Sequence, residues 1–120
     1  MTELTFSEAN EFNGDITKLS KKYRSLPEDM EVLKKVLQSE GVGPRGDSIV
    51  RIGNLGSSVK HPVYKVRHFR CRSLGKGSRS GIRVIFGHKE QDNIVLFVEI
   101  YYKGNQKNNN PQRIMKYFTS

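Results

Sequence analysis

The chain has 120 residues, which is enough for one compact domain with its own hydrophobic core and too few for two. Its single cysteine, Cys71, excludes an internal disulfide and a cysteine-based zinc cluster, and this usage fits a reducing cytoplasm. No apolar run approaches the roughly 20 residues of a membrane span, and the first residues lack the basic and apolar regions of a signal peptide. We therefore expect one cytoplasmic domain over residues 1–120, without a membrane segment.

The net charge of +9 is concentrated in the middle of the chain. Residues 1–47 contain seven basic and nine acidic side chains, whereas residues 48–89 contain ten basic side chains and no Asp or Glu. A domain that confines its excess charge to one segment attracts polyanions to one surface. This distribution favours nucleic acid as the partner over general solubility or an acidic protein surface.

The first part of the chain predicts a short strand followed by two helices. Thr2–Phe6 alternates like an edge strand, and Ser7 suits a helix N-cap because its hydroxyl accepts a bond from a first-turn amide. Apolar residues then recur at spacings of three and four up to Tyr23, which indicates one face of a helix. Pro27 is expected in the first turn of a second helix, and Gly41 is expected to end it.

Residues 41–62 form a glycine-rich loop, with a brief extended piece expected at Ser48–Ile52, and the pattern then changes to a period of two. Three strands are predicted, at Val63–Cys71, Gly81–Gly87 and Ile94–Tyr102, and their loops permit antiparallel pairing. A short C-terminal helix, PQRIMKYF, begins at Pro111. This order predicts an α+β fold, in which an N-terminal helical hairpin packs on a small antiparallel sheet and a short C-terminal helix follows.

Alternation along the strands predicts which side chains face away from the helices. Leu96, Val98 and Ile100 are expected in the core. Phe69, Cys71 and Phe97 are expected on the opposite, open face, where the first two cover an apolar gap. The polar side chains expected on the open face are Lys65, Arg67, Arg83, Glu99, Tyr101 and Lys103. Like charges on adjacent strands destabilise a sheet by up to about 1 kcal/mol per opposed pair, so this face is expected to bind an anion.

These segments resemble the RelE/ParE toxin superfamily, and within it the RelE-like and HigB-like ribonucleases. The resemblance covers almost the whole chain. It is carried by the hairpin FSEANEFNGDITKLSKKYRSLPEDMEVLKKVL, the strand YKVR, its partner SGIRVIF, the strand VLFVEIYYK and the closing RIMKYF. It implies a RelE-like toxin of a toxin–antitoxin pair that cleaves messenger RNA in the ribosomal A site. An acidic antitoxin protein is the expected neutralising partner.

The resemblance also implies roles for individual residues. Lys65 and Arg67 in YKVR match the two basic positions of the RelE strand, and Arg83 in GIRV matches the family's phosphate-binding arginine. The family's further arginine and tyrosine, which follow the last strand, are not matched in register by KGNQKNNNPQ. The candidates to fill the roles of general acid and base-stacking group are Lys103, Tyr101, Arg113 and Tyr117.

Cleavage of RNA by its own 2′-hydroxyl needs a base, cations around the phosphate and an acid for the leaving oxygen. Fixed positive charge lowers the pKa of a nearby lysine, so Lys65 is predicted to act as the base. Arg67 and Arg83 present planar donors to phosphate oxygens and are expected to stabilise the transition state. Glu99 is a rival base or an orienting counter-ion. No metal and no cofactor is expected.

The segment RSLGKGSRS lacks the Walker pattern and is expected to be a mobile hairpin tip that touches ribosomal RNA phosphates, or else a flexible turn without a ligand. The residues expected to bind RNA here are Arg70, Arg72, Lys76 and Arg79. Two other functions stay open. One is a ParE-like toxin that inhibits gyrase without nuclease activity, and the other is a non-catalytic RNA-binding module.

Overall fold

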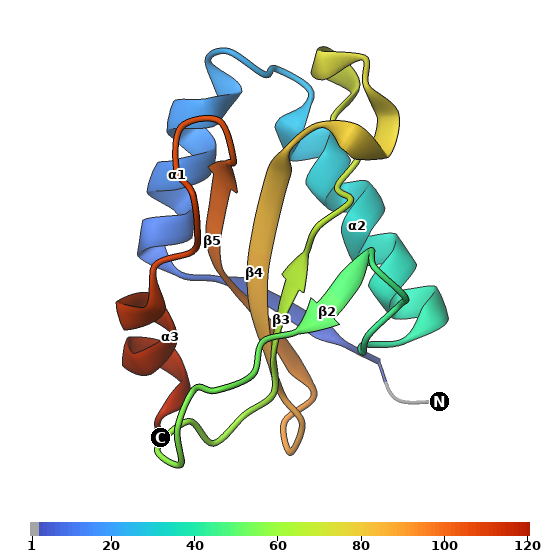
Figure 1. The fold of residues 1–120 in the computed structure, drawn as a ribbon. Coiled ribbons are helices and arrows are strands. Elements are labelled where there is room, and N and C mark those ends of the chain that lie inside the picture. The colour runs from blue at the N-terminus through green and yellow to red at the C-terminus, as the bar shows by residue number, and fades with distance from the viewer. Residues whose placement is uncertain (1–2) are drawn as a thin grey trace.

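The computed structural model describes residues 3–120 and has the predicted α+β class (Figure 1). Its strands are β1 (Thr5–Glu8), β2 (Ile49–Arg51), β3 (Val63–Val66), β4 (Ile82–Lys89) and β5 (Ile94–Tyr102). Its helices are α1 (Asn10–Ser20), α2 (Leu26–Glu40) and α3 (Pro111–Phe118). Two 3₁₀ turns, Arg72–Leu74 and Gly77–Arg79, lie in the connection between β3 and β4. Within residues 3–120, no helix is both long and apolar enough to cross a membrane.

The five strands form one mixed sheet in the order β1-β5-β4-β3-β2. β1 runs parallel to β5, with Thr5 opposite Ile94, whereas all other neighbouring strands are antiparallel. The prediction of an antiparallel sheet is therefore wrong for the first strand. The partner of β1 is β5, which lies far along the chain. A parallel pair needs no tight turn between its strands, so the turn residues of the sequence could not predict this pairing. Thr2, the first residue of the predicted strand, lies outside the described residues.

The ends of α2 and α3 follow their local signals. Pro27 lies in the first turn of α2, and Gly41 ends that helix with a φ of 92°, a conformation that favours glycine. Asn110 caps α3, because its side-chain oxygen accepts a hydrogen bond of 3.0 Å from a first-turn N–H. The predicted cap of the first helix is wrong. Ser7 lies in β1, and the N-cap of α1 is Ala9, which offers no side-chain acceptor.

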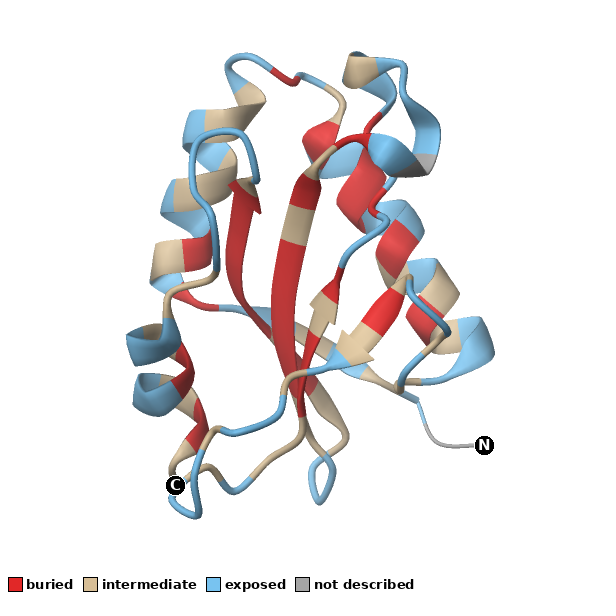
Figure 2. Ribbon diagram, viewed as in Figure 1, coloured by how far each residue is buried: buried red, intermediate tan, exposed pale blue. Residues whose placement is uncertain are grey.

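The helices α1 and α2 cover one face of the sheet. The ring of Phe12 in α1 lies 5.7 Å from that of Phe97, and the ring of Tyr23 lies 5.9 Å from that of Tyr102. Four buried apolar residues of α2 join the same core: Leu26, Met30, Leu33 and Leu37. Figure 2 shows the buried residues along the middle of the sheet and on the inward sides of the helices.

A β-bulge in β5 changes the predicted side-chain directions. Val98 is an extra residue that has no partner in β4, and Phe97 lies opposite Phe86 with the ring centroids 5.8 Å apart. Phe97 thus points toward the helices, and Leu96 points to the other face. The prediction that Leu96 faces the helical core and Phe97 the open face is wrong. Because every residue from Ile94 to Val98 is apolar, alternation in the sequence could not reveal the bulge.

Strand β3 is shorter than predicted, since it ends at Val66 and not at Cys71. The backbone N–H of Arg67 still bonds to the carbonyl of Ser48 at 2.7 Å, and the chain bends after it. Phe69 and Cys71 are buried, with 3% and 1% exposure, so they extend the core and are not part of an accessible surface.

Helix α3 covers one end of the sheet's second face. A Cβ at Gly87 of β4 would lie 2.3 Å from the ring of Phe118, so glycine here permits the close approach of α3. Gly87 shares this face with Lys65, because Val63 pairs with Gly87 and Lys65 with Ile85 two residues away on each strand. We call the part of this face that α3 leaves uncovered the open face.

Candidate functional site

Two rows of paired residues bring several predicted site residues together on the open face. Lys65 of β3 lies opposite Ile85 of β4, which in turn lies opposite Glu99 of β5. In the adjacent row, Arg83 of β4 lies opposite Tyr101 of β5. Residues from three strands thus share one surface, because side chains of paired residues point to the same side of a sheet.

Arg67 completes this group at the end of β3. The Nη1 atom of Arg83 donates a hydrogen bond of 2.8 Å to the main-chain carbonyl of Arg67. This contact fixes the guanidinium of Arg83 across the end of the strand and uses one of its five N–H donors. The side chain of Arg67 is exposed, and that of Arg83 is half-buried.

Lys65 is half-buried, and its partners on both neighbouring strands are apolar. Burial lowers the pKa of the Lys65 ammonium, the positive charges of Arg83 and Arg67 lower it further, and Glu99 opposes them. Sequence reasoning found the effect of the neighbouring cations but missed the larger effect of burial. The direction is the one required of a lysine that accepts a proton near neutral pH.

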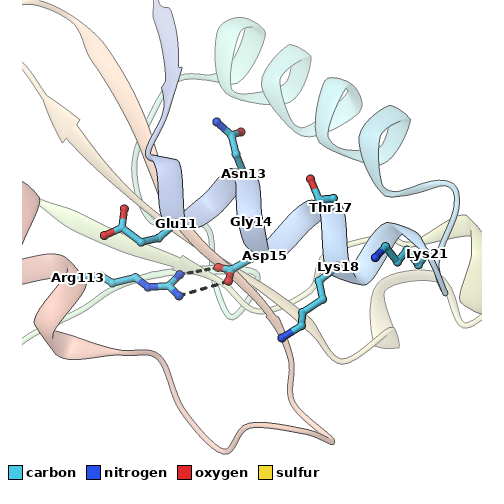
Figure 3. A pocket seen from close by; sticks show the side chains of 8 residues that line it. All are labelled: Glu11, Asn13, Gly14, Asp15, Thr17, Lys18, Lys21 and Arg113. Carbon is cyan, nitrogen blue, oxygen red and sulfur yellow. Dashed lines mark hydrogen bonds and ion pairs between the residues drawn. The ribbon is translucent and has the colours of Figure 1, made fainter.

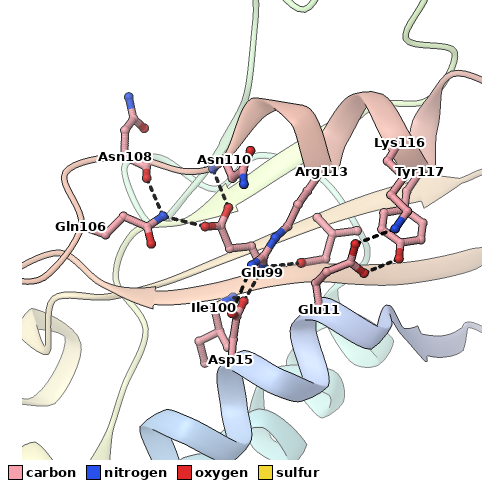
Figure 4. A network of polar contacts seen from close by, with 11 residues as sticks. Glu11, Asp15, Glu99, Ile100, Gln106, Asn108, Asn110, Arg113, Lys116 and Tyr117 are labelled. Carbon is pink, nitrogen blue, oxygen red and sulfur yellow. Dashed lines mark hydrogen bonds and ion pairs between the residues drawn. The ribbon is translucent and has the colours of Figure 1, made fainter.

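The loop between β5 and α3 supplies a second set of contacts. Asn108 accepts a hydrogen bond of 2.9 Å at Oδ1 from the Nζ of Lys65. Glu99 is 3% exposed, and its two oxygens accept bonds from the side chain of Gln106 at 2.6 Å and the N–H of Asn110 at 2.7 Å (Figure 4). Since both oxygens hold the loop, the arrangement favours an orienting role for Glu99 over that of a base.

Sequence reasoning missed Gln106 and Asn108. They lie in the polar run KGNQKNNN, which follows the last strand and has neither periodicity nor a motif. A single sequence gives no signal for which of several neighbouring amides reaches the sheet.

Tyr101 is only 5% exposed, and it lies opposite Arg83. Burial and the negative charge of Glu99 raise the pKa of its phenol, while Arg83 opposes them. The phenol therefore keeps its proton near neutral pH and is able to donate a hydrogen bond.

Arg113, another candidate, lies between α3 and α1. Its guanidinium donates to Asp15 of α1, with Nη1 and Oδ2 2.5 Å apart (Figures 3 and 4). It also donates to the carbonyl of Val98 at 3.2 Å. Asp15 in turn accepts the N–H of Ile100 at 3.2 Å. The ion pair thus satisfies backbone groups at the edge of β5 beyond the end of β1, and it raises the pKa of Arg113.

Tyr117 has a similar role. Its hydroxyl donates to one oxygen of Glu11 in α1, and the Nζ of Lys116 donates to the other at 2.8 Å (Figure 4). These bonds lower the pKa of Glu11 to about 2, and the same contact raises the pKa of Tyr117. Tyr117 and Arg113 therefore hold α3 against α1, and their polar groups are bonded to the carboxylates of Glu11 and Asp15.

Lys103 lies at the end of β5. Its N–H donates to the carbonyl of Gly81 at 2.8 Å, so the ladder between β4 and β5 continues by one residue. By alternation its exposed side chain shares the open face with Tyr101.

The basic residues of the β3–β4 connection differ in their surroundings. Arg72 pairs with Glu28 and Asp29 of α2, and its Nε lies 3.5 Å from Oδ1 of Asp29. The remaining predicted RNA-binding residues are exposed: Arg70, Lys76 and Arg79.

Two hollows lie along α1, and the smaller of them adjoins the Lys65 group. The larger, about 670 Å³, follows α1 and is lined by residues including Lys18 and Arg113 (Figure 3). The other, about 420 Å³, has Tyr101 and Gln106 in its lining and so adjoins the Lys65 group. Among residues 3–120, no three His, Cys, Asp or Glu side chains lie close enough to hold a metal ion.

The sheet and its helices match a solved structure, the archaeal RelE–RelB complex from Pyrococcus horikoshii OT3. The TM-score is 0.51 at 15% sequence identity, and the match covers 86% of this chain and 98% of that chain. The chain has a RelE-like fold. No protein-family model and no curated protein sequence matches the chain. At 15% identity the likeness concerns the RelE-like fold, so the roles of side chains rest on their geometry in this chain.

Proposed function

We propose that the chain is a RelE-like toxin that cleaves messenger RNA on the ribosome. The observation that best supports this is the position of Lys65, Arg67 and Arg83 on the open face of a RelE-like sheet. Two arginines beside a lysine of lowered pKa provide both phosphate binding and a base.

In the proposed reaction, Lys65 takes the proton of the RNA 2′-hydroxyl. The 2′-oxygen forms a bond to the adjacent phosphorus while the bond from phosphorus to the 5′-oxygen breaks. The products are a 2′,3′-cyclic phosphate and a 5′-hydroxyl. Arg83 and Arg67 donate hydrogen bonds to the phosphate oxygens as negative charge builds on them.

Lys103 is our candidate for the acid that gives a proton to the leaving 5′-oxygen. It is exposed on the open face, whereas Arg113 and Tyr117 are bound to carboxylates of α1. Tyr101 is too buried to offer a ring face for base stacking. We therefore assign its phenol a hydrogen bond to a phosphate oxygen.

We further propose that an acidic antitoxin protein neutralises the toxin in the cytoplasm. The solved neighbour is a RelE–RelB complex, and the net charge of +9 provides attraction for an acidic partner.

A translating extract with purified protein tests the cleavage. Arg83→Ala should lower the rate of messenger RNA cleavage by about 10²–10³-fold, the usual effect of removing one transition-state donor. Arg51→Ala is the matched control, because this exposed arginine of β2 pairs with Tyr64 and so points to the other face. Cleavage by Arg83→Ala at the wild-type rate would show that the proposed site is wrong.

A double variant, Lys65→Ala/Arg83→Ala, separates the two other functions. Toxicity that survives in Lys65→Ala/Arg83→Ala, together with DNA-damage signalling, would indicate a gyrase inhibitor. Salt-sensitive binding of RNA by the wild type with no strand scission would indicate a non-catalytic RNA-binding module.

A further inference from the structure

The loop from Gly104 to Asn110 makes contacts at the candidate base that the proposed reaction does not yet explain. Besides holding Glu99, the Nε2 of Gln106 donates to the main-chain carbonyl of Asn108 at 2.7 Å (Figure 4). That bond fixes the backbone of Asn108, whose side-chain oxygen accepts the hydrogen bond from the Nζ of Lys65. A continuous chain of hydrogen bonds therefore runs from Glu99 through Gln106 and Asn108 to Lys65.

The negative charge of Glu99 raises the pKa of Lys65 and so opposes the loss of its proton. Within residues 3–120 the two side chains nevertheless form no ion pair. Donors from the loop occupy both oxygens of the carboxylate, and the lysine is bonded to a neutral amide. The kind of acceptor matters, because a carboxylate in direct contact stabilises an ammonium far more than a neutral amide oxygen does.

We propose that Gln106 and Asn108 are positioning residues that hold Lys65 on a neutral amide and away from the Glu99 carboxylate. The inference rests on the proposed ribonuclease function, in which Lys65 must lose its proton. A carbonyl acceptor fixes the location of Nζ, and it accepts a bond from the neutral amine as well as from the ammonium. A carboxylate in its place would retain the proton on Lys65.

The surroundings of Lys65 on every neighbouring element agree with this assignment. On β2 and β4 the paired residues are apolar, and the loop contributes an amide. The charged or titratable groups that face Lys65 are Arg67 at the end of β3, Arg83 on β4, and Glu99 and Tyr101 on β5. Glu99 is thus the single negative group in this set, and the loop is what separates it from the base.

The test either replaces the amide of Asn108 by a carboxylate or removes a hydrogen bond that holds the carboxylate of Glu99. Asn108→Asp gives the Nζ of Lys65 a carboxylate as its hydrogen-bond acceptor. Gln106→Ala removes the hydrogen bond to one oxygen of Glu99. Asn109→Ala is the matched control, since its side chain belongs to none of these contacts. The pH dependence of messenger RNA cleavage under single-turnover conditions is measured on ribosomes with the full-length chain. The Cε resonance of Lys65 is titrated by NMR in parallel.

Asn108→Asp should move the midpoint of the rising limb upward by about 1 unit or more, as expected for an opposite charge within reach of a lysine. Its rate should fall about tenfold near neutral pH and recover at alkaline pH. Gln106→Ala should shift the midpoint in the same direction, and Asn109→Ala should leave it unchanged. The NMR titration of Lys65 should show the same order. A merely structural role would lower the rate equally at every pH.

The possible failures are distinct. If the wild type cleaves, Lys65→Ala does not, and both loop variants keep the wild-type midpoints, the inference is overturned and the proposed function stands. If the wild type cuts no messenger RNA on translating ribosomes, the proposed function is overturned and the positioning role with it.

Discussion

The chemistry proposed at Lys65 depends on the removal of one proton from one nitrogen. Burial among apolar partners, the two neighbouring arginines and the separation from Glu99 all favour the neutral amine. Arginine in the same place would supply the same positive charge but would stay protonated under all physiological conditions.

Lys65→Arg should therefore retain binding to the ribosome while cleavage falls by about 10²–10⁴-fold, the usual contribution of a general base. Sedimentation with ribosomes measures the binding, and primer extension on messenger RNA measures the cleavage. Equal loss of both activities would instead assign Lys65 to binding alone.

At the scale of single elements, the ring of Phe118 in α3 lies so close to β4 that position 87 has no room for a Cβ atom. Gly87→Ala would force the ring of Phe118 to move, and we expect it to lower the free energy of unfolding by about 1–3 kcal/mol. Gly14→Ala is the control, because Gly14 lies in α1 with no atom within 4 Å of an added Cβ. It should stabilise the protein by about 0.5–1 kcal/mol, and urea denaturation measures both changes.

The attachment of α3 to α1 should depend on acid. The folded-state pKa of Glu11 is about 2, below its ordinary value of 4.5. Its contribution to the free energy of unfolding is therefore complete above about pH 4.5 and is lost as the pH falls toward 2. Glu11→Gln should be less stable than the wild type at pH 6 and equal to it near pH 2 in urea denaturation. Glu90→Gln removes an exposed carboxylate that forms no ion pair within residues 3–120, so it controls for the change in net charge.

The elements also show how far the sequence alone determines this structure. Local signals at Pro27, Gly41 and Pro111 placed α2 and α3, because caps and breakers act within one turn of the chain. The partner of β1 and the bulge at Val98 were missed, since tertiary contacts decide them. For the candidate site, the strand pattern indicated the shared face of Lys65 and Arg83. It gave no information on the loop that reaches this face.

For the whole molecule, the uneven charge distribution predicts how binding responds to salt. Lys76 and Arg79 are exposed in the β3–β4 connection, whereas Arg72 is paired with carboxylates of α2. If this connection contacts RNA phosphates, Lys76→Ala and Arg79→Ala should each lower the slope of log affinity against log salt by about 1. Arg72→Ala should change it much less. Ribosome binding across a salt series measures the slopes, and identical slopes in all variants would show that the connection does not contact phosphate.

The pairing of β1 with β5 has a consequence for synthesis of the protein. The bond from Asn93 to Glu3 joins residues 90 positions apart, and the bond from Tyr117 to Glu11 joins residues 106 apart. The sheet is therefore completed, and α3 attached, only after residues 94–118 have been synthesised. Glu99, Gln106 and Asn108 lie beyond β4 in the chain, so in our proposal Lys65 gains its positioning contacts only after these later residues have been made.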